Sequence, residues 1–137
     1  MGAQLATLRD LPLFAGIGDD VLQRVLQVAA DLQVGPGEVL TRASERTSDI
    51  FVILDGKVAV DDPGNDPIEL GRGEFVGELA LLVPDAVRSA WVRAATDLHY
   101  LAISRDDFRD LLEAEPRIAL NMLPVVARRL WRSRRSL

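Results

Sequence analysis

Residues 77–90 read GELALLVPDAVRSA and combine a glycine, a carboxylate, a short apolar run and an Arg-Ser pair. Gly77 lets the backbone approach a ligand closely and begins a one-turn helix whose free N–H groups can point at an anion. Arg88 presents paired donors to two phosphate oxygens, and Ser89 adds a hydroxyl donor. Glu78 would repel a phosphate, so it is better placed to accept a hydrogen bond from a sugar hydroxyl such as the ribose 2′-OH. The stretch therefore predicts a site for a sugar-linked cyclic phosphate.

The sequence on both sides of this stretch has the turns of an all-β fold. Strand-like segments fill residues 32–103 and are separated by Gly/Pro/Asn/Asp turns at 35–37, 55–56, 63–65 and 71–73. Asp55-Gly56 joins DIFVIL to KVAVDD and predicts a hairpin, because this pair accepts the positive φ angles of a tight turn. Several such strands folded on themselves indicate a jelly-roll barrel, or double-stranded β-helix.

Helical periodicity flanks the β region on its N-terminal side. Leucines and valines recur at helical spacing in residues 1–31, around a break at Pro12, Gly16 and Gly18. Gly18 or Asp19 would cap the second of these helices.

Residues 104–137 return to helical periodicity after the last predicted strand. Ser104 and Asp107 resemble a capping arrangement, and Pro116 separates this helix from a second one that ends in an arginine cluster. Pro124 lies inside the second helix, where a proline usually produces a kink that costs on the order of 3 kcal/mol if unrelieved. The predicted fold class is thus mainly β with flanking helices (α+β), in one domain over residues 1–137.

The charge of the chain is unevenly distributed. Five of its sixteen basic residues lie in the last ten positions, where no acid occurs, so the preceding 127 residues hold eleven basic and twenty-one acidic residues. An acidic body argues against direct nucleic-acid binding. The basic tail either meets an acidic partner or nucleic acid, or supplies favourable charge at a helix C-terminus together with solubility.

Other features of the chain exclude several classes of protein. There is no cysteine, and the apolar runs are too short to span a bilayer, so we expect a soluble cytoplasmic protein with no membrane segment. His99 is the only histidine, which leaves neither a metal-ligand set nor a general base for a serine nucleophile, and we expect it on a strand surface. The acid pairs at 61–62 and 106–107 suit a solvated loop and a helix start better than catalysis. We expect no enzyme and no metal.

Residues 77–90 resemble the phosphate-binding cassette of the cyclic-nucleotide-binding domain family. FVGELALL at 75–82, RSAWVRA at 88–94 and ARRL at 127–130 are especially similar to the sensor domain of its catabolite activator branch. The resemblance covers nearly the whole chain. It implies N-terminal helices over 1–31, a β jelly roll over 32–103 that contains the cassette, and C-terminal helices over 104–137.

The resemblance also implies roles for individual cassette residues. Glu78 would bind the ribose 2′-OH, while Arg88 and Ser89 would bind the cyclic phosphate. Backbone groups would contribute further contacts, from Gly77, Leu79, Ala80 and Ala90.

The last helix is expected to complete the site. By the same resemblance, Arg129 falls where it can pair with Glu78, and Ser133 falls where a hydroxyl meets the adenine. Trp91 follows the Arg-Ser-Ala triplet, where members that prefer guanine often carry a hydroxyl residue, so cAMP is favoured over cGMP as the ligand. We expect Trp91 itself to pack against the barrel rather than to stack on the base.

The implied function is a cyclic-nucleotide sensor that relays binding of cAMP through its terminal helices to an attached domain or an effector protein. The last helix is apolar enough to form a homodimer, although the same residues could pack on the barrel. Two alternatives stay open: a degenerate domain that serves protein–protein contact, and the sensor fragment of a transcription regulator. The chain stops at Leu137, where the activator branch continues into a helix-turn-helix domain.

Overall fold

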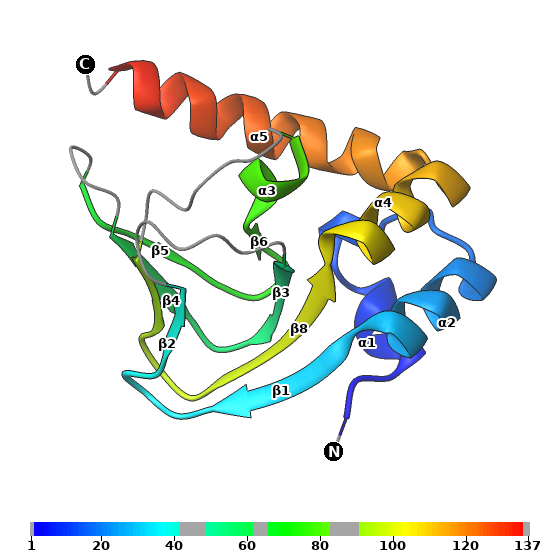
Figure 1. Ribbon diagram of the computed structural model, residues 1–137, viewed down its shortest axis with the longest axis horizontal. Coiled ribbons are helices and arrows are strands. Elements are labelled where there is room, and N and C mark those ends of the chain that lie inside the picture. Colours follow the sequence, from blue (N-terminus) through cyan, green and yellow to red (C-terminus); the bar gives the residue numbers. More distant parts are fainter. Residues whose placement is uncertain (1, 42–48, 62–65, 83–90, 136–137) are drawn as a thin grey trace.

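A computed structural model describes residues 2–41, 49–61, 66–82 and 91–135. Within these residues two four-stranded antiparallel sheets make a jelly-roll-like sandwich, with α5 running across its top and the other long helices beside it (Figure 1). One sheet has the order β1 (Ala30–Val34), β8 (Leu98–Ser104), β3 (Asp49–Asp55), β6 (Phe75–Val76). The other has the order β2 (Val39–Thr41), β7 (Trp91–Ala94), β4 (Val58–Asp61), β5 (Ile68–Leu70).

The two central strands of the first sheet are buried on both faces. Ile50 and Val52 of β3 face the core that the helices form, whereas Phe51 and Ile53 face the interior between the sheets. Successive side chains of a strand point to opposite faces, so a strand covered on both sides must be apolar at every position. The unbroken apolar run IFVIL at residues 50–54 follows from this position. In the interior, the Phe51 ring meets Tyr100 edge-on at a centroid distance of 5.6 Å.

The Asp55-Gly56 turn connects the two sheets and does not close a hairpin. Gly56 has φ +91°, as the sequence predicts, and a Cβ at this position would lie 2.1 Å from the Asp97 carbonyl oxygen. However, β3 pairs with β6 and β8, whereas β4 pairs with β5 and β7. The predicted hairpin is therefore wrong, because the tight turn sends the chain across the sandwich instead of back along its neighbour.

The N-terminal helices are short and break where the sequence predicts. They are α1 (Leu5–Arg9), the 3₁₀ turn η1 (Pro12–Phe14) and α2 (Asp19–Val28), for which Gly18 is the N-cap residue. Their buried residues join one core with α4 and the outer face of the first sheet. The predicted mainly β fold with flanking helices is confirmed, although its two sheets are separate in hydrogen bonding and form no closed barrel in the part described.

The C-terminal helices are α4 (Arg105–Ala114) and α5 (Arg117–Arg135). The Ser104 hydroxyl accepts a hydrogen bond from the Asp107 backbone N–H at 3.2 Å, which confirms the predicted N-cap. Pro116 separates the two helices as expected. The helix α5 continues through Pro124 without a break, so the proline does not end it.

Candidate functional site

The chain turns sharply between β6 and α3 (Glu78–Leu82). Gly77 has φ +102°, a conformation that side chains with a Cβ rarely adopt, and it is buried. The one-turn helix α3 starts directly after it, with Glu78 in its first turn. The predicted glycine turn and one-turn helix are therefore present.

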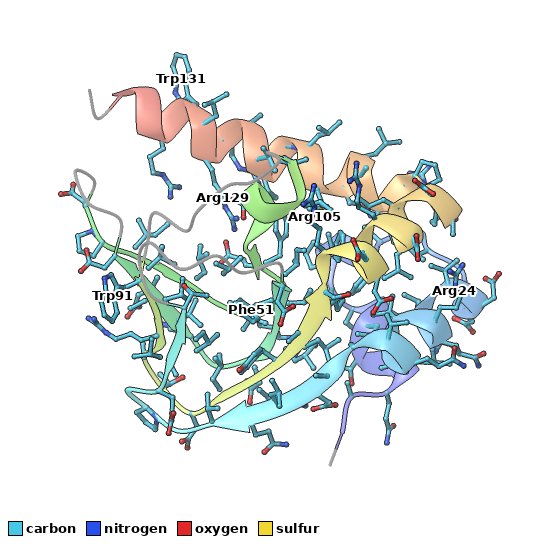
Figure 2. All side chains as sticks on the ribbon, in the orientation of Figure 1. Arg24, Phe51, Trp91, Arg105, Arg129 and Trp131 are labelled. Atoms are coloured by element: carbon cyan, nitrogen blue, oxygen red, sulfur yellow. The ribbon has the colours of Figure 1, made fainter. Side chains whose placement is uncertain are left out.

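A guanidinium from α5 is held against this turn. Arg129 Nη1 lies 3.0 Å from Glu78 Oε1, and the side chains of Arg129 and Glu78 are only 19% and 15% exposed. Arg129 Nη2 donates to the Phe75 carbonyl oxygen at 2.7 Å, and its Cζ lies 4.7 Å from the centroid of the Phe75 ring. Figure 2 shows Arg129 pointing from α5 toward the roll. The structure thus brings Arg129 and Glu78 together across more than fifty residues of sequence.

These contacts link the last helix to the candidate ligand site. Three separate interactions restrain one guanidinium, so a movement of α5 larger than the Arg129 side chain can follow would break them. Conversely, a ligand that donates a hydrogen bond to the Glu78 carboxylate changes the environment of the group with which Arg129 pairs. The arrangement is suited to coupling site occupancy to helix position.

A family model named "Cyclic nucleotide-binding domain" matches residues 31–115. The chain belongs to the cyclic nucleotide-binding domain family. Apart from Ala30 at the start of β1, the described strands, the glycine turn after β6 and α3 lie inside the matched residues, whereas the whole of α5 lies outside them.

Curated relatives of this cyclic nucleotide-binding domain include channels and transcription regulators. A cyclic nucleotide-gated potassium channel of Rhizobium etli is 38% identical over 109 residues, which cover 80% of this chain and 30% of the channel. The cAMP-activated global transcriptional regulator CRP of Salmonella typhimurium is 38% identical over 96 residues, covering 66% of this chain and 46% of the regulator. The chain thus spans less than half the length of these relatives.

Solved structures share the fold. The catabolite activator protein of Thermus thermophilus superposes with a TM-score of 0.74 at 27% identity, covering 89% of this chain and 59% of that one. A protein of a cyclic-GMP-dependent signalling pathway that regulates bacterial phytopathogenesis gives a TM-score of 0.68 at 25% identity, covering 83% and 94%. The predicted closeness to the catabolite activator sensor domain is confirmed.

The remaining predicted site residues divide into two groups. Leu79 and Ala80 lie in α3, and Ser133 lies in the last turns of α5. Arg88, Ser89 and Ala90 lie outside the described residues. Their roles in binding a nucleotide stay predictions.

Two residues of this cyclic nucleotide-binding domain were missed by sequence reasoning. Phe75 supplies both a carbonyl oxygen and a ring to Arg129. Asn121 donates from Nδ2 to the carbonyl oxygens of Leu13 and Ala15, at 2.9 and 3.0 Å, which fixes α5 to η1. The sequence did hold one signal for Asn121, because it lies on the same face of the helix as the buried residues Ile118 and Met122. A polar side chain on that face needs a hydrogen-bond partner.

Trp91 lies on the outer side of the roll. The strand β7 alternates between exposed and buried positions, with Trp91 and Arg93 outward and Val92 and Ala94 buried. The indole is 40% exposed, so the sheet covers it only in part and the predicted packing is incomplete. Figure 2 shows Trp91 beside β4, at the side of the roll opposite the N-terminal helices.

His99 lies on β8 and pairs with a carboxylate. Its Nε2 is 2.6 Å from Asp31 Oδ1, and Asp31 also accepts from the Ala3 backbone N–H. Burial acts to raise the pKa of Asp31, but the hydrogen bonds from Ala3 and His99 outweigh it and lower the pKa below its ordinary value. The predicted strand position of His99 is confirmed.

The part of the chain that the structure describes holds neither a metal-ligand cluster nor a membrane-spanning helix. Over residues 2–41, 49–61, 66–82 and 91–135, no three His, Cys, Asp or Glu side chains converge as metal ligands do. Across these same ranges, no helix is both apolar enough and long enough to cross a bilayer.

Proposed function

We propose that this cyclic nucleotide-binding domain is a cAMP sensor whose output is the position of α5. The observation that carries the proposal is the ion pair between Arg129 on α5 and Glu78 on α3, placed at the glycine turn of the cassette. Glu78 would accept from the ribose 2′-OH, Arg88 and Ser89 would bind the phosphate, and Gly77, Leu79, Ala80 and Ala90 would add backbone contacts. Ser133 on α5 would meet the adenine.

The proposed relay follows from linkage. A ligand shifts an equilibrium between two helix positions only by the difference in its affinity for them. Bound cAMP touches Glu78, which is the partner of Arg129, and reaches α5 itself through Ser133. The contacts of cAMP with Glu78 and with Ser133 both depend on the position of α5. Binding of cAMP therefore favours one position of α5, and that position in turn favours binding of cAMP.

The choice of cAMP over cGMP rests on the residue after the Arg-Ser-Ala triplet. Trp91 offers no hydroxyl to a guanine, and its ring faces outward from β7. The relatives include both a cAMP-activated regulator and a cyclic-GMP pathway protein, so a direct comparison of the two nucleotides decides the matter.

The test is isothermal titration of the domain with cAMP and, in parallel, cGMP. We expect micromolar or tighter binding with a preference for cAMP. Arg88→Ala should abolish or greatly weaken binding, because it removes the strong charge on the phosphate, while Arg24→Ala on the exposed face of α2 serves as the charge-matched control. No heat from either nucleotide would instead indicate a degenerate domain that serves protein contact.

A second arm of the titration tests the ribose contact. Glu78→Ala should weaken cAMP binding by about 1.5–3 kcal/mol, the contribution of a hydrogen bond to a charged group. The 2′-deoxy analogue should lose a similar amount with the unmodified domain and nothing further with Glu78→Ala. Equal affinity for cAMP and its 2′-deoxy analogue would refute this role.

We further propose that α5 forms a homodimer. Leu120, Leu123 and Leu130 are 58%, 58% and 62% exposed, and their spacing of three and seven residues is that of a coiled-coil seam. Trp131 is 63% exposed, and Figure 2 shows it pointing away from the roll. Leu123→Asp should convert a dimer to a monomer in sedimentation equilibrium, whereas Arg24→Asp should not.

The effector that responds to α5 would be an attached domain or a separate cytoplasmic protein. Relatives of this domain carry it within a potassium channel and within a transcription regulator, and each is more than twice the length of the matched segment. A pull-down with the cAMP-loaded and the empty domain would distinguish a ligand-dependent partner from none.

A further inference from the structure

Arg105 carries a buried nitrogen that has no hydrogen-bond partner. It is the first residue of α4 and directly follows Ser104, the N-cap of that helix. The side chain as a whole is partly buried, but its Nε is shielded from solvent and meets no acceptor among the described residues. A buried donor of this kind destabilises a fold, because it gives up its hydrogen bonds to water and gains none in return.

The position of Arg105 is also unfavourable for its charge. The N-terminus of a helix carries a partial positive charge, so a cation in the first turn is disfavoured there. Arg109 lies one turn further along α4, and like charges four residues apart on a helix repel one another. Arg105 thus departs from three local preferences at once. Such departures are expected at sites that serve function rather than stability.

The helix α3, which belongs to the candidate site, packs against α4. Contacts join α3 to α4 and α4 to α5, and Figure 2 shows Arg105 near the place where the three helices meet. The last four carbonyl groups of an α-helix have no partner within it, and they carry the partial negative charge of its C-terminal end. Because α3 has only five residues, most of its carbonyl groups are of this kind. The C-terminal end of α3 therefore offers acceptors that suit a guanidinium.

We propose that Arg105 is a positioning residue of the cAMP site. When cAMP is bound, Arg105 Nε donates to a backbone carbonyl oxygen at the C-terminal end of α3 and holds this helix against α4. The inference rests on the proposed function and adds a second link to it. Arg129 of α5 pairs with Glu78 in the first turn of α3, so two arginines from the two C-terminal helices restrain the two ends of α3.

This role gives Arg105 opposite effects on two measurable quantities. Binding of cAMP gains a charge-assisted hydrogen bond and relieves the unpaired donor at the same time. An apolar side chain in place of Arg105 removes the unpaired donor, so the domain without nucleotide becomes more stable while its affinity for cAMP falls. A side chain that only supports the fold would lower the stability when it is replaced.

The test measures both quantities in Arg105→Met, which keeps the aliphatic stem and removes the guanidinium. Without nucleotide, the midpoint of urea unfolding should rise by about 0.7 M or more, as expected when an unpaired buried donor is removed. In calorimetry, the affinity for cAMP should fall about tenfold or more. Arg105→Lys keeps the charge but places a methylene group where Nε lies, so it should lose affinity as Arg105→Met does.

The control is Arg109→Met, which removes an exposed arginine from the same helix and should leave the affinity for cAMP unchanged. Unchanged affinity in Arg105→Met, or full affinity in Arg105→Lys, would overturn this inference alone, because the unaltered domain would still bind cAMP. A lower urea midpoint for Arg105→Met without nucleotide would assign Arg105 a structural role and overturn it as well. Absence of cAMP binding by the unaltered domain would overturn the proposed function and this inference with it.

Discussion

The contact between Arg129 and Glu78 predicts a measurable coupling free energy. We consider the variants Glu78→Ala and Arg129→Met, alone and together; methionine keeps most of the aliphatic stem while removing the charge. An exposed ion pair contributes about 0.2–1 kcal/mol. Each partner here is less than one fifth exposed, and the Nη1–Oε1 distance is 3.0 Å. The coupling should therefore exceed the exposed range, at about 1.5 kcal/mol, because a hydrogen bond to a charged group contributes about 1.5–3 kcal/mol.

The single variants should differ from one another. Glu78→Ala removes the ion pair but leaves Arg129 bonded to the Phe75 carbonyl oxygen, so we expect a loss of about 2 kcal/mol in the free energy of unfolding. Arg129→Met removes in addition that hydrogen bond and the cation–π contact, which contributes about 0.5–2 kcal/mol. We expect a loss of about 3 kcal/mol for Arg129→Met, part of which the thioether regains against the Phe75 ring.

The assay is urea unfolding of the four proteins of this double-mutant cycle, followed by circular dichroism. For a domain of this size, with a slope m of about 1.5 kcal/mol per molar urea, a loss of 3 kcal/mol moves the midpoint by about 2 M. A parallel cycle with Arg24→Met in place of Arg129→Met should give no coupling, because Arg24 lies on α2. A coupling below about 0.4 kcal/mol would refute the reasoning, since independent sites add to within that amount.

Substitutions at three further positions test the fold that positions the site. Gly56→Ala should destabilise the domain by more than about 2 kcal/mol in urea unfolding, because φ is +91° and the new Cβ meets the Asp97 carbonyl oxygen; a loss under 0.5 kcal/mol would contradict the turn. Ser104→Ala should cost about 1 kcal/mol by the loss of the N-cap of α4, whereas Ser104→Asp should restore most of it. Asp31→Asn should destabilise the domain more at pH 7 than at pH 3. The hydrogen bonds of Asp31 lower its pKa in the folded state. The ionised carboxylate therefore adds to the free energy of unfolding above the pKa of the unfolded state, about 3.9, and this addition is lost as the pH falls through the folded pKa. Equal destabilisation at both pH values would contradict this.

Sequence alone determined the class of fold and the position of the glycine turn. Turn residues at short intervals require short strands, and helical spacing of apolar residues on both sides requires flanking helices, because both patterns are local. The positive φ angle of Gly56, the glycine turn at Gly77 and the Ser104 cap are local as well, so each was predictable from a few neighbouring residues. The family also followed from local motifs at close spacing.

Tertiary structure decided how these local pieces are connected. The path from β3 to β4 failed as a hairpin because strand pairing depends on which sheet offers a partner, and a two-residue turn carries no information about that. Local sequence patterns also did not predict that Arg129 would donate to the Phe75 carbonyl oxygen. Nor did they predict that Asn121 would donate to the Leu13 carbonyl oxygen. The pairing of Arg129 with Glu78 came from family resemblance, and only the packing of α5 across the roll places the two side chains at 3.0 Å. Contacts between residues far apart in the sequence depend on the whole core, and for that reason local patterns do not determine them.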